Sequence, residues 1–177
     1  MNGELFCSIR PEEMEGNPFQ LIGKDWMLLT AALPDGRVNM MTANWGGMGV
    51  MWGKNVFSCV IRPQRYTLPF AEESGRISLC FFEEEYRDVL RFCGAHSGRD
   101  CDKLAQTGLT VCRNERGAVW FAQAKLALLG RIIYRDVIRP EGFLDSDIPA
   151  HAYPGGDYHR RFVCEVEEIL RHVKAEK

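Results

Sequence analysis

The segment MTANWGGMGVMWGKNVFSCVIRPQRYT, from Met41 to Thr67, decides the fold and carries the most chemistry. It begins as a strand, passes through a Gly/Trp-rich stretch, returns to a strand at 56–61 and ends on two arginines and a hydroxyl cluster. Glycine lets backbone approach a flat or charged ligand closely, and tryptophan offers a large amphipathic surface beside it. Arg62 and Arg65 are suited to a phosphate. A planar ring that carries a phosphate, as FMN does, would use all of these features.

The same segment also allows a plainer interpretation, in which tryptophans pack a strand end and the two arginines are solvated. From Gly47 the spacing is G-x-G-x-x-W, which departs from the dinucleotide-binding turn, and no helix follows directly. Phosphate binding would therefore rely on the arginines and on the start of a helix at Thr67–Pro69.

The composition is that of an ordinary globular domain. The chain has 177 residues, of which 46% are hydrophobic and 26% charged, and its net charge is −2. We expect one domain over residues 1–177, with no general affinity for nucleic acid or anionic membranes. No apolar run is long enough to span a bilayer.

Seven cysteines are present, at positions 7, 59, 80, 93, 101, 112 and 164. They form no C-x-x-C motif, several lie in apolar runs, and no secretory signal precedes the first. We therefore expect reduced, mostly buried thiols in a cytoplasmic protein. Cys93 and His96 could suggest a nucleophile and its base, but no third group orients them, so a buried structural thiol is the preferred interpretation.

Apolar patterns predict strands at residues 5–9, 26–33, 38–43, 56–61, 76–82, 119–121, 125–138 and 161–173. Pro34-Asp35-Gly36 is a turn, so 26–43 is predicted to be a β-hairpin.

Helices are expected between these strands. The first covers 64–74, with Thr67 as its N-cap and Gly75 after its end. The second covers 83–93 and stops at Gly94, and a short third helix stops at Gly108. Residues 140–156 contain three prolines and no periodicity, which predicts a long loop. This order is mainly β with inserted helices, and it favours a closed or partly split antiparallel barrel over a doubly wound sheet.

Two further segments are candidates for binding. In Ser97-Gly98-Arg99-Asp100-Cys101-Asp102-Lys103, Arg99 and Lys103 would project from one helical face toward an anion, although a capped helix start explains the segment equally simply. In 153–159 (YPGGDYH), Asp157 and His159 lie two apart and would point the same way on an extended chain. Histidine can orient an amide-bearing ring such as nicotinamide. A glycine turn before a strand is the plainer alternative, and a metal site with His151 lacks a third ligand.

Taken together, five segments resemble the flavin reductase-like family, the split-barrel FMN-binding group that includes flavoredoxin. They are NPFQLIGKDWMLLTA (17–31), NMMTANWGGMGVMWGK (39–54), VIRPQRYT (60–67), SGRDCDK (97–103) and YPGGDYH (153–159). The resemblance implies a Greek-key antiparallel split β-barrel and a homodimer, with FMN held non-covalently near the subunit interface.

The resemblance also implies roles for individual positions. The segment 42–45 would line the ribityl chain and ring, 62–67 would face the phosphate, and 97–103 would close on the cofactor. The implied cofactor-binding residues are Thr42, Ala43, Asn44, Trp45, Arg62, Arg65, Tyr66, Thr67, Ser97, Gly98, Arg99 and Lys103. Asp157 and His159 would form the nicotinamide or substrate side, and they match the family's Gly-Asp-His signature only if Tyr158 is an insertion. Cys164 stands where a glycine usually follows.

These features predict a flavin-dependent oxidoreductase in which NAD(P)H reduces FMN, which passes electrons to an acceptor or redox partner protein. The protein would fix ring position, charge and access. The alternatives are an FMN electron carrier of the flavoredoxin type without a nicotinamide site, which the altered signature favours, and an interaction protein with an empty barrel.

Overall fold

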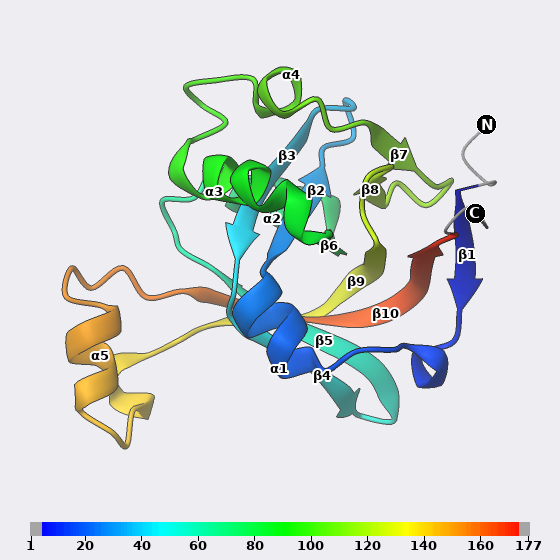
Figure 1. Ribbon diagram of the computed structural model, residues 1–177. Helices are drawn as coiled ribbons and strands as arrows, with labels where there is room; N and C mark the ends of the chain where they lie inside the picture. Colours follow the sequence, from blue (N-terminus) through cyan, green and yellow to red (C-terminus); the bar gives the residue numbers. More distant parts are fainter. Residues whose placement is uncertain (1–4, 174–177) are drawn as a thin grey trace.

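The computed structural model describes residues 5–173 as a curled antiparallel sheet with helices around it (Figure 1). The eight-stranded sheet has the order β3-β2-β6-β9-β10-β5-β4, and β1 pairs with β10. Its strands are β1 (Phe6–Ile9), β2 (Met27–Ala32), β3 (Val38–Ala43), β4 (Gly46–Met51), β5 (Lys54–Ile61), β6 (Arg76–Phe81), β9 (Leu126–Val137) and β10 (Arg160–His172). A separate hairpin joins β7 (Val111–Arg113) to β8 (Val119–Phe121). The mainly β split-barrel class expected from the sequence is confirmed.

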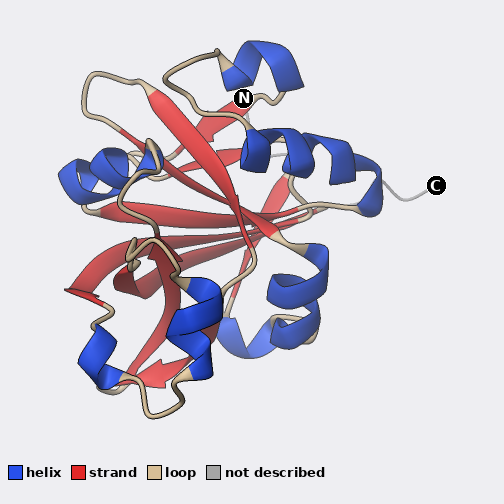
Figure 2. Ribbon diagram, turned by 90° about the vertical axis from the view of Figure 1, so that its left-hand side faces the viewer, coloured by secondary structure: helices blue, strands red, loops and turns tan. Residues whose placement is uncertain are grey.

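Helices are short and lie outside the strands (Figure 2). They are α1 (Pro18–Gln20), the π-helical turn Leu21–Asp25, α2 (Thr67–Ser74), α3 (Arg87–Ala95), α4 (Lys103–Thr107) and α5 (Asp147–Ala152), with 3-10 turns at Pro11–Glu13, Glu84–Tyr86 and Pro140–Gly142. No helix within residues 5–173 is long and apolar enough to cross a membrane.

Strand β2 shows how the core is divided. All six of its residues are buried; Met27, Leu29 and Ala31 belong to one apolar cluster, and Leu28 belongs to a second. Leu29 belongs to the cluster that α2 covers with Phe70, and Leu28 belongs to the cluster that α3 covers with Leu90. Because successive strand residues point to opposite faces, one strand can anchor both helices. Both helices thus pack against the same strand, next to β3.

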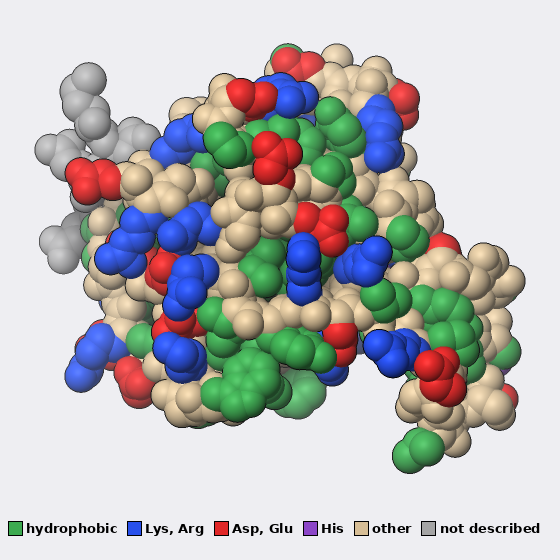
Figure 3. Space-filling model, turned by 180° about the vertical axis from the view of Figure 1, so that it is seen from behind, with side chains coloured by type: hydrophobic (Ala, Val, Ile, Leu, Met, Phe, Trp, Pro, Cys, Tyr) green, Lys and Arg blue, Asp and Glu red, His purple; other side chains and the backbone are tan. Residues whose placement is uncertain are grey.

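The reverse side of the molecule carries interspersed basic and acidic side chains, with an apolar patch near its lower edge (Figure 3). Ion pairs join neighbouring strands: Glu165 of β10 pairs with Lys54 of β5 and with Arg131 of β9 at 2.6 Å each. Exposed pairs of this kind contribute little stability individually, about 0–1 kcal/mol. Side chains of both signs lie on this face (Figure 3), and the net charge of the whole chain is −2.

Several sequence-based expectations are confirmed. The hairpin 26–43 exists as β2 and β3, with Met27 opposite Ala43. Gly75 and Gly108 end α2 and α4 in the left-handed conformation, as expected for glycine after a helix. Cys93 is fully buried. Burial raises the pKa of the Cys93 thiol to about 11, so it is not poised as a nucleophile at neutral pH.

The Gly/Trp-rich stretch differs from the expectation, because most of it is a strand. Residues Gly46–Met51 form β4, which pairs with β5 around a two-residue turn at Trp52 and Gly53. Both turn residues have positive φ, 54° and 69°, as the favoured hairpin turns require. Tryptophan is an unusual residue at such a position, so the turn signal was not visible in the sequence.

The helix boundaries differ at two places. Thr67 is the first residue of α2, not its N-cap, and its hydroxyl accepts a hydrogen bond from the Asn39 amide at 2.9 Å. Gly94 lies inside α3, which continues to Ala95. A Cβ at Gly94 would lie 3.3 Å from Cβ of Thr42. Gly94 therefore allows α3 to approach β3 closely and does not stop the helix.

The predicted loop 140–156 is partly wrong. It contains the turn Pro140–Gly142 and the six-residue helix α5 (Asp147–Ala152). We call residues 139–158, which include this segment, the arm. The arm projects from the body at the left of Figure 1. Pro149 is accommodated because it lies in the first turn of α5, where its missing N–H has no helical acceptor.

Candidate functional site

A pocket of about 180 Å³ lies where β3 ends and where the chain leaves β5. It is lined by Met41, Thr42, Ala43, Asn44, Trp45, Val60, Arg62, Arg65 and His159. Most of these residues were expected at the site, and the structure brings segments 42–45, 62–65 and 159 together. The register explains this convergence, because Arg160 in β10 pairs with Ile61 in β5 and so places His159 beside Arg62. We call this cavity the ring pocket.

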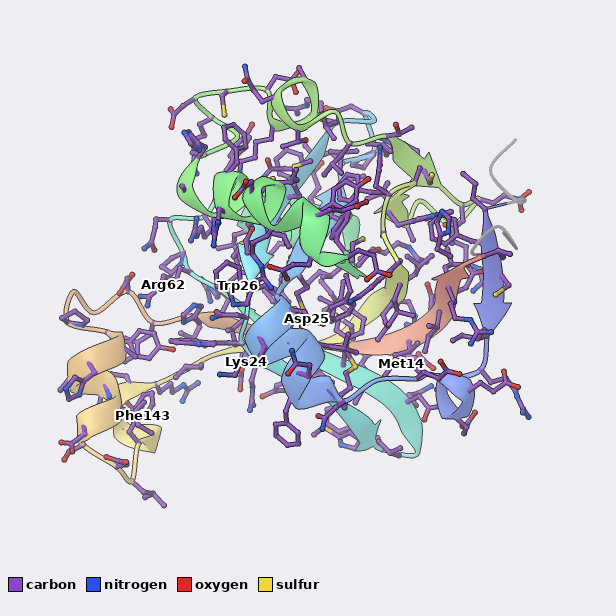
Figure 4. All side chains as sticks on the ribbon, in the orientation of Figure 1. Met14, Lys24, Asp25, Trp26, Arg62 and Phe143 are labelled. Carbon is purple, nitrogen blue, oxygen red and sulfur yellow. The ribbon has the colours of Figure 1, made fainter. Side chains whose placement is uncertain are left out.

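Arg62 connects the ring pocket to the arm. Its guanidinium donates to the Ala152 carbonyl at 2.8 Å, pairs with the Asp157 carboxylate at 2.5 Å and lies 5.2 Å from the Tyr153 ring centroid. Figure 4 shows Arg62 at the junction between the body and the arm, which carries Phe143. The Asp157 carboxylate also accepts from the Gln64 amide at 2.7 Å. Hydrogen bonds from Gln64 and Arg62 lower the pKa of Asp157 below its ordinary value.

Arg65 and Lys103 meet at the C-terminal end of α3. Arg65 donates to the Gly94 carbonyl at 2.8 Å, and the Lys103 ammonium donates to the carbonyls of Cys93 at 2.8 Å and Met40 at 2.9 Å. Cations at a helix C-terminus are favourable, because the unpaired carbonyls there carry partial negative charge. Lys103 is only 5% exposed, and this burial lowers the pKa of its ammonium. Two of its three donors thus serve the fold.

The remaining phosphate candidates line a second cavity of about 660 Å³. Its walls include Tyr66, Gly98, Arg99 and Lys103. Arg99 donates to the Gln64 carbonyl at 3.0 Å and stacks 4.9 Å from the Tyr66 ring centroid. We call this cavity the basic pocket. Arg65 and Tyr66 are consecutive in the chain and line the ring pocket and the basic pocket, respectively.

Three predicted residues of this group have structural partners. Gly98 packs against Asn39 and the Tyr66 ring so closely that a Cβ would overlap the Asn39 amide. Ser97 Oγ accepts the Arg99 backbone N–H at 3.2 Å. Thr67 is buried and bonded to Asn39. These three residues help to hold the loop 97–103 and α2 against β3, and Gly98 also lines the basic pocket.

His159 is buried at the inner wall of the ring pocket. It is 7% exposed, its Nδ1 lies 2.8 Å from the Tyr153 hydroxyl oxygen, and its ring centroid lies 5.2 Å from that of Trp45. Burial, reinforced by the positive charge of Arg62, lowers the pKa of His159 to about 4. The imidazole is therefore neutral at pH 7. Asp157 is turned toward Arg62, so the two residues grouped from the sequence have different environments.

Sequence reasoning did not single out Tyr153, Gln64 or Val60. Tyr153 stood in the quoted segment 153–159 but carried no spacing signal, because its contact with His159 depends on how the arm folds. Thr42 was expected to face the cofactor; its hydroxyl also donates to the Leu90 carbonyl of α3. Within the described residues, no group of His, Cys, Asp and Glu side chains could hold a metal ion.

The geometry can now be compared with known proteins. A family model described as "Flavin reductase like domain" matches residues 20–177. Among curated proteins, no sequence matches this chain.

Solved structures with the same fold include three flavin proteins. Flavoredoxin from Methanosarcina acetivorans is 20% identical with a TM-score of 0.63, covering 86% of this chain and 69% of that one. The FMN-binding protein from Thermus thermophilus, solved with bound p-hydroxybenzaldehyde, is 21% identical with a TM-score of 0.63, covering 92% and 80%. An NADH:FAD oxidoreductase from Streptomyces globisporus is 17% identical with a TM-score of 0.60, covering 83% and 75%. At these identities the likeness establishes the fold.

Proposed function

The chain belongs to the flavin reductase-like family, and from that premise we propose that it is an oxidoreductase that binds FMN non-covalently in the ring pocket. The observation that carries the proposal is the convergence of segment 42–45, Arg65 and His159 on one cavity. These elements supply backbone donors, a cation and an aromatic wall, which suit a flat ring with an anionic tail.

The residues that line the ring pocket fit FMN in chemistry, and the volume of the pocket indicates how the cofactor would lie. The ring pocket of about 180 Å³ is smaller than the roughly 300–1,000 Å³ of most cofactor pockets. The basic pocket, which begins at Tyr66 next to Arg65, has about 660 Å³ beside Tyr66 and Arg99. We propose that the phosphorylated tail extends toward these residues. A second copy of the chain would cover the side of the ring pocket that is open to solvent, as expected for the homodimer of this family.

When bound, FMN would supply the redox chemistry, and the protein's residues would control its environment. Arg65 would balance negative charge on the phosphate with a charge-assisted hydrogen bond worth about 1.5–3 kcal/mol. Backbone N–H groups between Ala43 and Trp45 would stabilise negative charge on the reduced ring. Trp45 would cover one edge of the pocket and limit water.

The electron donor distinguishes two forms of the proposal. In the first, NAD(P)H reduces the flavin, and its nicotinamide is oriented by His159, which lines the ring pocket despite the inserted Tyr158. The Streptomyces globisporus oxidoreductase of the same fold is named for such a reaction. In the second, the protein is an electron carrier. The observation that favours the carrier is that Asp157 is already engaged by Arg62 and Gln64.

One experiment separates these forms. Purified protein is loaded with FMN and mixed under argon with NADH or NADPH while the flavin absorbance is followed. Rapid bleaching supports the reductase, and bleaching by dithionite alone supports the carrier. Protein that is colourless as purified and takes up no added FMN would refute both. Size-exclusion chromatography of the same sample tests the proposed homodimer.

A further inference from the structure

We propose that Tyr153 is a positioning residue that holds His159 as the Nε2–H tautomer, so that the ring pocket presents one fixed hydrogen-bond donor. The class of ligand that such a donor suits is a carbonyl compound, either the carboxamide of a nicotinamide or a ketone or aldehyde acceptor. The choice of ligand rests on the proposed function, whereas the tautomer can be tested on the protein alone.

The direction of the hydrogen bond follows from burial. The Tyr153 hydroxyl oxygen lies 2.8 Å from Nδ1 of His159, and the two side chains are 6% and 7% exposed. Within residues 5–173 the hydroxyl makes no other hydrogen bond. If the imidazole donated, the hydroxyl hydrogen would be buried without an acceptor, which is the more costly arrangement. The hydroxyl therefore donates, Nδ1 accepts, and in a neutral ring the hydrogen is on Nε2.

The imidazole is neutral and therefore has a tautomer to set. Burial lowers the pKa of His159 to about 4, with Arg62 and Arg65 adding to the effect and Asp157 opposing it. Burial raises the pKa of the Tyr153 hydroxyl, so the hydroxyl keeps its proton at neutral pH. His159 lines the ring pocket, and its Nε2 makes no hydrogen bond within the described residues. That N–H is available to a ligand.

Aromatic contacts fix both rings. The His159 ring lies 5.2 Å from Trp45 and meets the Tyr153 ring edge-on at 5.4 Å and 78°. The Tyr153 ring stacks on Tyr158 at 4.6 Å and 28°, with the Arg62 guanidinium 5.2 Å away. Tyr158 is the residue inserted between Asp157 and His159 relative to the family signature. Its stacking on Tyr153 gives that insertion a role, since it steadies the ring that orients the histidine.

The direct test is the tautomer of His159 in full-length protein labelled with ¹⁵N-histidine. Two-bond correlations between ring protons and ring nitrogens show which nitrogen carries hydrogen, and the His159→Gln spectrum assigns the signals. We expect hydrogen on Nε2 in the wild type and a shifted Nδ1 signal in Tyr153→Phe. Tyr158→Phe is the matched control, because it removes a neighbouring hydroxyl that does not bond His159. Hydrogen on Nδ1 in the wild type, or unchanged nitrogen signals in Tyr153→Phe, would overturn the proposal.

A functional measurement checks the consequence. Tyr153→Phe should retain FMN and raise the KM for NADH, whose nicotinamide carries the carboxamide, about three- to tenfold, as loss of one oriented hydrogen bond predicts. Tyr158→Phe should remain within about twofold of the wild type. An unchanged KM in Tyr153→Phe would remove the functional part of the proposal. If the wild type binds no flavin, the proposed function fails, while the NMR spectra still decide the role of Tyr153.

Discussion

Substitution of Lys103 is the sharpest test of whether a predicted site residue stabilises the fold or binds the cofactor. The family resemblance places this lysine on the cofactor, but its ammonium donates to the carbonyls of Met40 and Cys93 and is 5% exposed. In Lys103→Met the alkyl chain is kept, and two buried carbonyls lose their partner at about 1–3 kcal/mol each. Relief of the cost of burying the charge offsets part of this loss. We expect a net destabilisation of about 2–4 kcal/mol, or roughly 5–15 °C in Tm.

Thermal unfolding followed by circular dichroism measures this loss, and fluorescence titration with FMN measures affinity well below Tm. We expect the FMN affinity of the folded variant to stay within about threefold of the wild type. Lys54→Met is the matched control, since its exposed ion pair with Glu165 contributes about 0–1 kcal/mol. The reasoning is refuted if Lys103→Met leaves Tm unchanged but weakens FMN binding tenfold or more.

Three other substitutions test the site and the fold. Arg65→Ala should weaken FMN binding about ten- to a hundredfold, whereas Arg91→Ala on exposed α3 should not; equal retention on dialysis would contradict the phosphate role. Asp157→Asn should loosen the arm, giving faster tryptic cleavage at pH 7. Hydrogen bonds from Gln64 and Arg62 hold the pKa of Asp157 in the folded protein below its ordinary value of 3.8. The wild type should therefore keep its protection against cleavage until the pH falls through that lowered pKa. Below it, pepsin should cleave the wild type and Asp157→Asn at the same rate. Trp52→Asn should stabilise the β4–β5 hairpin by about 0.5–1 kcal/mol, because asparagine tolerates positive φ; a lower Tm would show that the Trp52–Tyr134 contact dominates.

The elements that the sequence predicted well are those whose signals are local. The hairpin 26–43 has a turn with a clear mechanism between two apolar runs, and Gly75 and Gly108 end helices through their own conformational freedom. Strand β4 was missed because its glycines suggested a ligand loop and its turn lacks the usual asparagine. Gly130 was not noticed, although a Cβ there would lie 2.5 Å from the Phe57 ring. Such close approaches depend on which strands become neighbours.

The site shows the same division. Residue types predicted which side chains could hold a phosphate or a ring, and seven of them do line the ring pocket, from Thr42 to His159. The sequence could not show which basic side chains use their donors in hydrogen bonds to the protein's own backbone. Lys103 and Arg99 have the same charge and lie four apart, yet one is buried against two carbonyls and the other stacks on Tyr66. Burial decides the difference, and burial is a property of the assembled structure.

The inserted Tyr158 links these observations to function. An insertion of one residue between Asp157 and His159 would be expected to move both side chains away from the nicotinamide. In the structure, His159 still lines the ring pocket, and only Asp157 is engaged elsewhere. Tyr158 lies before β10 and stacks on Tyr153, His159 lines the ring pocket, and Asp157 pairs with Arg62 at 2.5 Å. A nicotinamide entering this pocket would therefore meet a neutral imidazole donor but not an available carboxylate. Tyr153→Phe removes the group that orients the imidazole, and Asp157→Asn removes the carboxylate that Arg62 engages, so the two substitutions test the roles of His159 and Asp157 separately.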